Sequence, residues 1–553
     1  MKKNILILAM VLIGVSAQGY AKNSINIFPD PINVQFYDYE VPLTHFWEIV
    51  ILESNAELSQ IIDYFNEQLF EKVNYKLPVI TTNNLLKKQL IIGRNNTEAL
   101  KAVGFTSEQL PNDQGYILEI TKNNIFIIGE NIRGIFYGIQ SFLQMLNNGQ
   151  AQLPGVRIVD YPKNLIRAVH FCAGDFNDIE RQLDFLSTLK INTVILDSWV
   201  FFNLENRENQ NKIKKAKKIA DKYFIEIIPE IQSFGAPGGV LTKDPYCVEA
   251  EYVREQRFYF FNNEALPLVR GKKALTNVVK TESAPVIIKS IEGIVYQEGI
   301  DYKVILGKIK PKFKENNQTQ IIRLAGGKIN PGQEVRISYD QILWLDSFAE
   351  WKIPYCPSEP RTYEIMFSAL ENIYKIIKPR FISIGHDEIR GMNKDSRCLR
   401  RNMSNAELLA DEINQLNNYA KNLDPNLRLL MWDDMINPWH NGSNENYQLG
   451  FHGPQGATQD AVKLISKDVL MMIWWTEAKD WLHKMENSLD YFKKQGFNFF
   501  AFCYDNEENI KKWVQLINNR SDCLGIICAS WWGFDKSKEW FKKTAYWSWR
   551  GVF

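Results

Sequence analysis

The stretch that decides the fold is RFISIGHDE, residues 380–388, in which a short apolar run ends in a glycine, a histidine and two adjacent carboxylates. Apolar runs of four to eight residues with polar or glycine boundaries are typical of buried strands in a parallel sheet. Side chains that follow such strands lie at their carboxyl ends, where a parallel α/β fold gathers its functional groups. The pattern therefore predicts a strand that presents Asp387 and Glu388 to a shared site.

Similar runs recur on both sides of this stretch, at residues 166–171, 192–196, 224–229, 428–432, 469–474, 498–503 and 525–530. Stretches with helical periodicity lie between most of them, for example 179–190, 362–378, 406–421, 482–495 and 507–518. Eight strand-then-helix units are the signature of a (β/α)8 barrel. We therefore predict an α/β fold whose residues 160–553 form such a barrel.

Two regions do not fit the barrel repeat. Residues 23–155 alternate as strands at 47–52, 89–92, 116–120 and 125–128, followed by a helix at 132–146, which predicts a small α/β domain. In that helix Gly134 and Gly138 allow close packing, and residues 154–162 are expected to be a connector. The long interval between the third and fourth barrel strands contains residues 266–347, whose alternating Val, Ile and Lys predict an inserted β-sandwich-like module.

The N-terminus has the layout of an export signal. Lys2 and Lys3 precede an apolar run at 5–15, and small residues follow. We expect residues 1–21 to be cleaved and the mature protein to be periplasmic or secreted. The run is too short for a comfortable membrane span, and no later stretch approaches about 20 uninterrupted apolar residues.

Composition excludes several classes of function. The 553 residues are 45% apolar, with 65 basic and 64 acidic side chains, which excludes a disordered or fibrous chain and gives no field for binding nucleic acid. The seven cysteines are scattered without CxxC spacing, which argues against a disulfide scaffold or a zinc cluster. The formation of one or two disulfide bonds after export is left as an alternative. No Gly-x-Ser-x-Gly elbow or Gly-rich cofactor loop is present, so we expect no cofactor.

The predicted strand ends carry acidic and aromatic side chains. Carboxylates bind sugar hydroxyls and flat aromatic rings stack on sugar faces, so the pattern predicts a glycan substrate. The side chains are Asp175; Asp197 and Trp199; Glu230; His386, Asp387 and Glu388; Trp432, Asp433 and Asp434; Trp474, Trp475 and Glu477; Tyr504 and Asp505; and Trp531 and Trp532.

The adjacency of Asp387 and Glu388 favours a particular chemistry. A conventional glycosidase places two carboxyl groups about 5 to 9.5 Å apart across the scissile bond, which neighbouring residues rarely span. A 2-acetamido sugar supplies its own nucleophile, its carbonyl oxygen, so the protein needs only an acid and a carboxylate that orients the acetamido group. Glu388 would be the acid and Asp387 the orienting carboxylate. A metal held by His386, Asp387 and Glu388 is the alternative, but no HExxH spacing supports it.

These motifs resemble glycoside hydrolase family 20, the β-N-acetylhexosaminidases, over nearly the whole mature chain. Residues 134–140 resemble the closing helix of the small domain that precedes the family's barrel, residues 229–235 its third-strand motif, and residues 384–388 its Gly-Gly-Asp-Glu signature. The resemblance implies a TIM barrel with catalytic Asp387 and Glu388. It also implies that Arg167, near the start of the first strand, grips sugar hydroxyls.

The resemblance further assigns the remaining substrate-binding residues. It implies aromatic walls at Trp432, at Trp474 or Trp475 and at Trp531 or Trp532, an acetamido-binding Tyr504 beside Asp505, and sugar contacts from Glu230, His386 and Asp433. Three positions depart from the family pattern: His386 replaces a glycine, Ala236 replaces a common histidine, and Gly533 follows Trp532 where a glutamate is expected nearby.

Three hypotheses follow from the sequence. The first is an exported exo-acting hexosaminidase-like hydrolase that uses the neighbouring acetamido group. The second is a barrel hydrolase of a different glycoside, and the third is a catalytically silent glycan-binding protein. The sequence does not determine the sugar configuration, the linkage or the oligomeric state.

Overall fold

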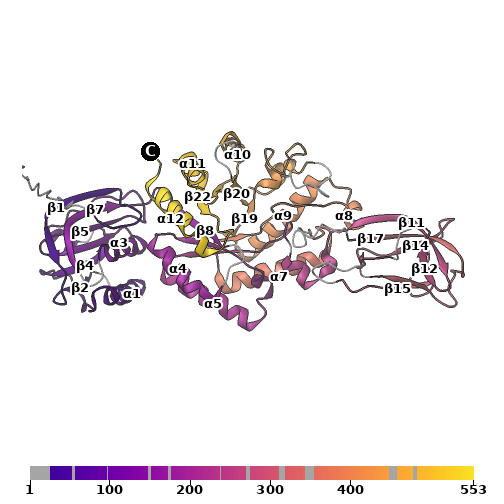
Figure 1. The fold of residues 1–553 in the computed structure, drawn as a ribbon, viewed down its shortest axis with the longest axis horizontal. Helices are drawn as coiled ribbons and strands as arrows, with labels where there is room; N and C mark the ends of the chain where they lie inside the picture. The colour runs from indigo at the N-terminus through magenta and orange to yellow at the C-terminus, as the bar shows by residue number, and fades with distance from the viewer. Residues whose placement is uncertain are drawn as a thin grey trace, which may run out of the picture. The chain divides into compact units, whose positions relative to one another are not determined.

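The computed structural model describes residues 25–52, 56–95, 98–146, 151–171, 176–236, 238–268, 275–309, 318–342, 354–446, 457–476 and 482–552. The predicted export signal, residues 1–21, lies outside this part of the chain. Two compact units divide the protein, Met1–Tyr161 and Pro162–Phe553 (Figure 1). Among the described residues, no helix is both long enough and apolar enough to cross a membrane.

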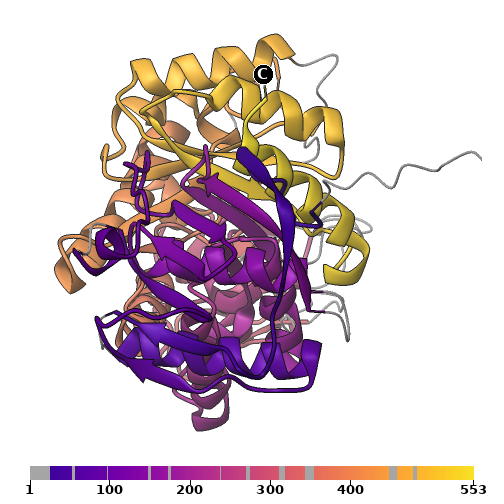
Figure 2. The same ribbon diagram turned by 90° about the vertical axis from the view of Figure 1, so that its left-hand side faces the viewer.

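The first unit is a seven-stranded mixed sheet with helices (Figure 2, indigo and purple). All four predicted strands and the predicted helix are present. The segment expected to be a connector is instead strand β7, because it pairs with both β1 and β5. The strands, in the order β1-β7-β5-β6-β4-β2-β3, are β1 (Asn33–Pro42), β2 (Glu48–Ile51), β3 (Val79–Thr81), β4 (Gln89–Arg94), β5 (Tyr116–Ile120), β6 (Ile125–Gly129) and β7 (Gln152–Asp160), and the helices are α1 (Ala56–Val73), α2 (Glu98–Ala102) and α3 (Ile132–Met145).

Glycines let α3 lie directly against the sheet. A Cβ on Gly134 would lie 2.2 Å from the Gly115 carbonyl oxygen, and one on Gly138 would lie 2.7 Å from a methyl of Ile127. Neither space admits a side chain. The side chain of Asn131 begins the helix by accepting from two backbone N–H groups, as an N-cap residue does.

The second unit contains a closed barrel of eight parallel strands, which confirms the predicted fold class. Each observed strand overlaps a predicted apolar run. The strands are β8 (Ile166–Phe171), β9 (Thr193–Asp197), β10 (Glu226–Glu230), β18 (Phe381–Ser383), β19 (Arg428–Trp432), β20 (Leu470–Trp474), β21 (Phe499–Cys503) and β22 (Cys523–Cys528). Pairing of β22 with β8 closes the ring.

The barrel interior is a packed core. One buried cluster draws a side chain from every strand: Ala168, Ile195, Ile228, Phe381, Leu430, Leu470, Met472, Phe500 and Ile527. The barrel's helices are α4 (Ile179–Thr188), α5 (Arg207–Lys222), α6 (Gly238–Lys243), α7 (Pro360–Ile377), α8 (Ser396–Leu399), α9 (Asn405–Leu423), α10 (Leu482–Lys494), α11 (Glu507–Ile517) and α12 (Phe534–Arg550).

The insertion between β10 and β18 is an antiparallel β module with one shared core. It begins earlier than expected from the sequence, because β11 starts at Glu251 and pairs with β17 along most of its length. The strands form a single hydrogen-bonded sheet instead of two. They are β11 (Glu251–Phe261), β12 (Glu264–Pro267), β13 (Val278–Val279), β14 (Ile287–Ser290), β15 (Tyr302–Ile305), β16 (Gln320–Arg323) and β17 (Glu334–Gln341).

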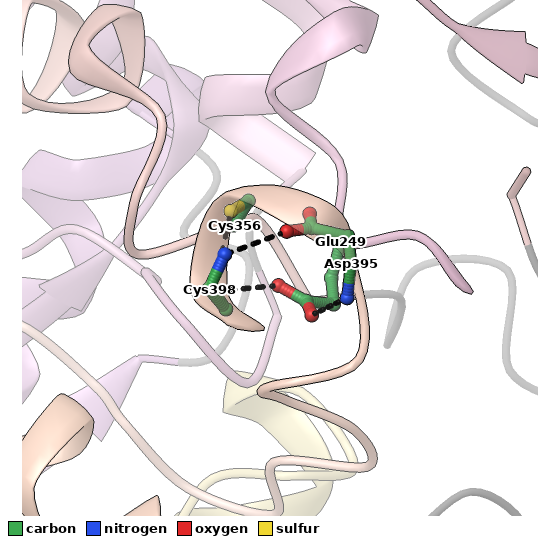
Figure 3. Close-up of side chains that lie close together, drawn as sticks. All are labelled: Glu249, Cys356, Asp395 and Cys398. Atoms are coloured by element: carbon green, nitrogen blue, oxygen red, sulfur yellow. Dashed lines mark hydrogen bonds between the residues drawn. The ribbon is translucent and has the colours of Figure 1, made fainter. Parts of the chain in front are cut away.

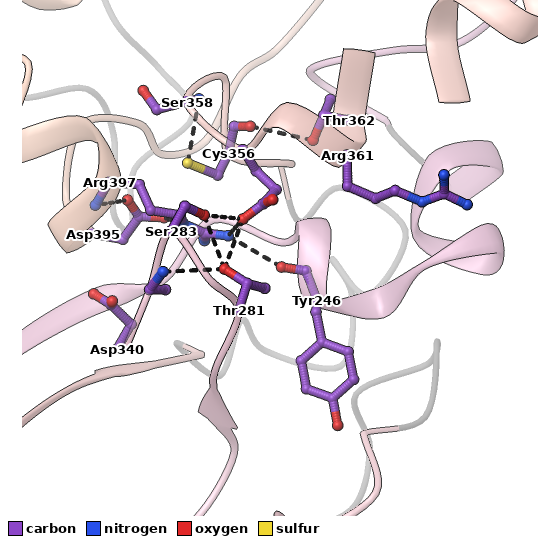
Figure 4. A network of polar contacts seen from close by, with 12 residues as sticks. Tyr246, Thr281, Ser283, Asp340, Cys356, Ser358, Arg361, Thr362, Asp395 and Arg397 are labelled. Atoms are coloured by element: carbon purple, nitrogen blue, oxygen red, sulfur yellow. Dashed lines mark hydrogen bonds and ion pairs between the residues drawn. The ribbon is translucent and has the colours of Figure 1, made fainter. Parts of the chain in front are cut away.

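A buried arginine joins this module to the barrel (Figure 4). The guanidinium of Arg397 donates to Asp395 and Glu359 and to the carbonyl oxygens of Tyr246 and Val248. Hydroxyl groups of the module, those of Thr281 and Ser283, donate to the same carboxylate of Glu359. The module is therefore anchored by charge-assisted hydrogen bonds at its root.

Candidate active site

The turn after β18 holds the two predicted catalytic residues in an unusual backbone conformation. Gly385, His386 and Glu388 have φ values of 73°, 74° and 50°. A positive φ costs a non-glycine residue of order 1 kcal/mol or more, and such conformations persist where the surroundings enforce them. The two strained residues flank Asp387, so the local backbone is fixed by its neighbours and not by its own preference.

Contacts from the next strand ends enforce this turn. Gly235, which follows β10, lies so close that a Cβ on it would be 1.6 Å from the Asp387 carbonyl oxygen. From β19, Oδ2 of Asp434 accepts a 2.9 Å bond from the Glu388 backbone N–H and another from Nδ2 of Asn441. The catalytic pair is thus held between β10 and β19.

Asp434 is a third carboxylate of this site. Burial and the negative charges of Asp387 and Glu388 raise its pKa from 3.8 to about 7, against the opposing effect of the bonds from Asn441 and the Glu388 N–H. Near neutral pH, Asp434 therefore exchanges a proton beside the catalytic pair. The sequence placed it at a strand end without assigning it a role.

Replacing Asp434 by Asn should remove the pH dependence of stability that Asp434 causes. Because the pKa of Asp434 in the folded protein lies above the ordinary 3.8, the free energy of unfolding decreases as pH rises from about 4 to about 7. The shift corresponds to about 4 kcal/mol at most. We expect Asp434→Asn to be less destabilised, relative to the native chain, at pH 8 than at pH 4.5.

Urea denaturation at a series of pH values measures this difference. Asp460→Asn is the matched control, since it removes one charge from a side chain that is 62% exposed. An identical pH trend in both variants would contradict the assignment of the titration to Asp434.

Behind the turn, His386 points into a buried polar network and not toward a substrate. Its Nε2 bonds Glu412, which also accepts from the Tyr355 hydroxyl, and its Nδ1 lies 2.8 Å from Ser233 Oγ. Burial lowers the pKa of His386, but the Glu412 carboxylate outweighs it and the pKa is raised. The predicted sugar contact of His386 is therefore wrong: the ring is fully buried and anchors the turn.

A second imidazole and carboxylate pair lies at the ends of β8 and β10. Oε1 of Glu230 lies 3.1 Å from His170 Nε2 and 2.7 Å from Gln232 Nε2, and its Oε2 accepts from Ser383. Glu230 is fully buried, which corrects its predicted direct contact with sugar. It orients His170, a residue that the sequence analysis did not select.

Asp197, at the end of β9, adds another carboxylate to this group. Burial and the charge of Glu230 raise its pKa from 3.8 to about 7. Of the smaller effects, the charge of His170 lowers this pKa and the charge of Asp387 raises it. Asp387 also raises the pKa of His170. The cluster therefore shares its protons among several groups, with Asp387 within electrostatic reach of each.

Aromatic rings border the same cluster. The His170 ring lies 5.7 Å from Trp432 and 5.2 Å from Trp531, centroid to centroid, and Trp531 is 40% exposed. Within the described residues, His170 Nδ1 and Trp432 Nε1 are buried with no hydrogen-bond partner. Such donors call for a partner, and hydroxyl and amide groups of a sugar would supply one. Trp432 and Trp531 thus lie beside His170, and their contact with a sugar stays a prediction.

The neighbouring strand ends divide into binding and structural residues. Trp474 is half-buried and packs against the barrel core, whereas Trp475 is 2% exposed and donates to Ser488. Asp433 is fully buried between the Asn437 amide and the Trp474 backbone N–H. The structure therefore corrects the predicted sugar contacts of Trp475 and Asp433. Both side chains are buried and support the aromatic wall from behind.

Tyr504 and Asp505 follow β21 and are partly accessible. Tyr504 packs at the edge of the barrel core, and Asp505 accepts a 2.8 Å bond from the Trp532 indole N–H. Trp532 is 60% exposed. These three residues keep their predicted place at the rim.

Arg167 lies at the wrong end of its strand for the predicted role. Its Nε and Nη2 donate to the Lys190 carbonyl oxygen and its Nη1 to those of Asn164 and Leu165, and the guanidinium covers the Trp549 ring. The side chain is fully buried near the amino end of β8. Since substrates bind at the carboxyl ends, Arg167 stabilises the barrel and does not grip a sugar.

Two departures from the family pattern also have a place in the structure. Ala236 is buried in the loop after β10, and Gly533 has a φ of 85° where α12 begins. Asp175 and Glu477, which the sequence analysis named at strand ends, lie outside the described residues.

Comparison with known families finds a match in the first unit of the chain. The model named glycosyl hydrolase family 20, domain 2, matches residues 24–161. A lacto-N-biosidase of Bifidobacterium bifidum is 33% identical over 135 residues, 22% of this chain and 12% of that protein. A beta-hexosaminidase of Porphyromonas gingivalis is 30% identical over 183 residues, 30% of this chain and 22% of that protein. The aligned parts thus span less than a quarter of either relative.

Solved structures share the fold over nearly the whole chain. The chitobiase of Flavobacterium johnsoniae superposes with a TM-score of 0.60 at 16% identity, covering 96% of this chain and 70% of that one. A β-N-acetylhexosaminidase of Bacteroides fragilis gives 0.57 at 14% identity, covering 94% and 90%. The family model thus matches the N-terminal unit, and the solved structures show that nearly the whole chain shares their fold.

Proposed function

We propose that this protein is an exported glycoside hydrolase that removes a terminal 2-acetamido sugar by substrate-assisted, retaining hydrolysis. One observation carries the proposal: Asp387 and Glu388 are adjacent on a strained turn that Gly235, Asp434 and the His386–Glu412 pair hold in place. The relatives named for hexosaminidase activity support the same substrate class.

In the first step, the acetamido carbonyl oxygen attacks the anomeric carbon while Glu388 gives its proton to the departing glycosidic oxygen. The leaving group departs as an alcohol, and the positive charge of the cyclic intermediate is stabilised by the carboxylate of Asp387. In the second step, Glu388 takes a proton from water, whose oxygen opens the ring and restores the sugar with retained configuration.

The cluster around this pair sets its electrostatics. Asp197 and Asp434 each have a pKa of about 7, so near neutral pH they are partly protonated. Fewer negative charges therefore surround Asp387 and Glu388. Trp432 and Trp531 supply flat faces beside His170 for the sugar ring.

A panel of nitrophenyl glycosides, with and without the 2-acetamido group, tests the proposal. We expect turnover of acetamido sugars only, with inhibition by a thiazoline mimic of the cyclic intermediate. Turnover of plain hexosides would favour the second candidate, a barrel glycosidase of a different glycoside, for which the further buried carboxylates Asp197 and Asp434 are available. No turnover together with binding on a glycan array would identify a silent glycan-binding protein.

Export is part of the proposal and has its own test. The export signal should be absent from the mature protein. N-terminal sequencing of material recovered from the periplasm or medium would show a start at residue 18 or 22, following cleavage after Ala17 or Ala21.

A further inference from the structure

Four metal-ligating side chains meet at the root of the inserted module (Figure 3). Glu249 precedes β11, Cys356 precedes α7, and Asp395 and Cys398 lie at the start and within α8. Each offers a ligand atom within 4.8 Å of the others. All four are buried, and three of them are fully inaccessible. None belongs to the candidate active site.

We propose that this cluster is a structural zinc site. The Cys356 and Cys398 sulfur atoms are 3.5 Å apart, and Cys398 Sγ is 3.7 Å from Glu249 Oε2. In a tetrahedral zinc site, bonds of about 2.3 Å to sulfur and about 2.0 to 2.2 Å to oxygen place neighbouring ligands roughly 3.4 to 3.8 Å apart. These two separations match edges of that tetrahedron, and all four ligand atoms lie within 4.8 Å of one another.

The donor set favours zinc over the other common cations. Two thiolates with two carboxylates form a mixed sulfur and oxygen set that Zn²⁺ accepts. Mg²⁺ and Ca²⁺ require shells of oxygen alone. Four protein ligands without an open position are typical of a structural site and not of a catalytic one.

Hydrogen bonds already orient the two carboxylates. Glu249 Oε1 accepts from the backbone N–H groups of Lys394 and Asp395, which leaves Oε2 directed at Cys398. Asp395 Oδ1 accepts from the N–H groups of Arg397 and Cys398, and its Oδ2 accepts from the Arg397 guanidinium. Such outer partners are typical of metal ligands.

The charge around the site is also balanced from outside. The Arg397 guanidinium donates to Asp395 Oδ2 at 2.9 Å, and it carries a positive charge next to a site rich in negative ligands. Replacing it with an uncharged side chain would leave those ligands less compensated.

A metal here would connect three segments of the chain. The segments that enter and leave the module already meet at this point, since Cys356 N–H donates to the Cys247 carbonyl and Glu249 N–H to that of Pro354. Asp395 and Cys398 belong to the segment that leaves the Asp387–Glu388 turn. A bound Zn²⁺ would therefore fix this segment to the root of the module.

Cobalt titration of the full chain tests the site directly. The protein is reduced, stripped with a chelator and titrated with Co²⁺ without oxygen. We expect near-ultraviolet thiolate-to-cobalt absorption and the visible bands of a tetrahedral centre, both abolished by one equivalent of Zn²⁺. Addition of Zn²⁺ should also raise the thermal midpoint of the stripped chain.

Variants identify the ligands. Cys398→Ser should weaken the thiolate band, since only Cys356 remains, and weaken Zn²⁺ binding by at least about tenfold, whereas Glu249→Gln should weaken binding and leave the band in place. Cys523→Ser is the matched control, because this thiol lies on β22 and takes no part in the cluster. It should bind Zn²⁺ like the native chain.

Three results would overturn the proposal. One is a native chain that gives no cobalt absorption after reduction. Another is a folded Cys398→Ser variant that keeps native Zn²⁺ affinity. The third is a count of free thiols that rises by two when the chain is reduced, while the reduced chain still binds no metal. That result would make Cys356 and Cys398 a disulfide pair.

Discussion

Glu388→Gln is expected to lower kcat/KM for a 2-acetamido glycoside by about 100-fold to 10,000-fold, because it removes a positioned general acid and base. The loss should be larger for a sugar leaving group than for nitrophenol, since nitrophenolate departs with little help from a proton. Steady-state kinetics on an acetamido disaccharide and on the matching nitrophenyl glycoside measure both values. An equal loss on the two substrates would contradict the role of Glu388 as the acid.

Asp387→Asn completes this test, because it removes the charge that stabilises the intermediate while it keeps the shape of the side chain. We expect a loss of similar size on acetamido substrates and weaker binding of a thiazoline mimic. Asp460→Asn, on the exposed surface, is the control for charge alone. Unchanged inhibitor binding in Asp387→Asn would remove Asp387 from the proposed role.

Glu412→Gln is expected to reduce the free energy of unfolding by about 3 to 5 kcal/mol, because it leaves the buried His386 imidazole without its ion partner. Both side chains are fully inaccessible, so water cannot replace the lost carboxylate. The turn that carries Asp387 should loosen, which would lower kcat more than it changes KM. Chemical denaturation and steady-state kinetics measure the two effects.

A second variant separates the ion pair from the backbone strain. His386→Gly removes the imidazole but relieves the positive φ, whereas His386→Ala keeps the strain, so the glycine variant should be the more stable by about 1 kcal/mol. Combining His386→Gly with Glu412→Gln should cost less than the sum of the two single changes. Additive losses would show that the two groups do not act as a pair.

The sequence alone predicted the elements that repeat. The eight barrel strands were each visible as short apolar runs, because a strand buried on both faces excludes polar residues along its length. Strand β11 was missed, since its EYVREQRFYFF sequence is charged and half-exposed. Strand β7 was taken for a connector because Pro154 and Gly155 interrupt its apolar pattern.

The same rule located the site. Residues at the carboxyl ends of parallel strands must meet, so Asp387, Glu388, Trp432 and Trp531 could be named from position alone. Position does not say which way a side chain points. In the structure, His386 bonds Glu412, Asp433 bonds Asn437 and Trp475 bonds Ser488. The residues that lie near Asp387 and Glu388 are instead His170 and Asp434.

What the sequence by itself determined is therefore the barrel, its inserted β module and the strand-end position of Asp387 and Glu388, because periodicity and strand-end position are local properties of the chain. Only the tertiary structure decided that Arg167 packs near the amino end of β8, that Asp197 and Asp434 lie within electrostatic reach of Asp387, and that Glu249, Cys356 and Cys398 converge. Those contacts join residues far apart in the chain, and their energies depend on burial and distance, which no local pattern encodes.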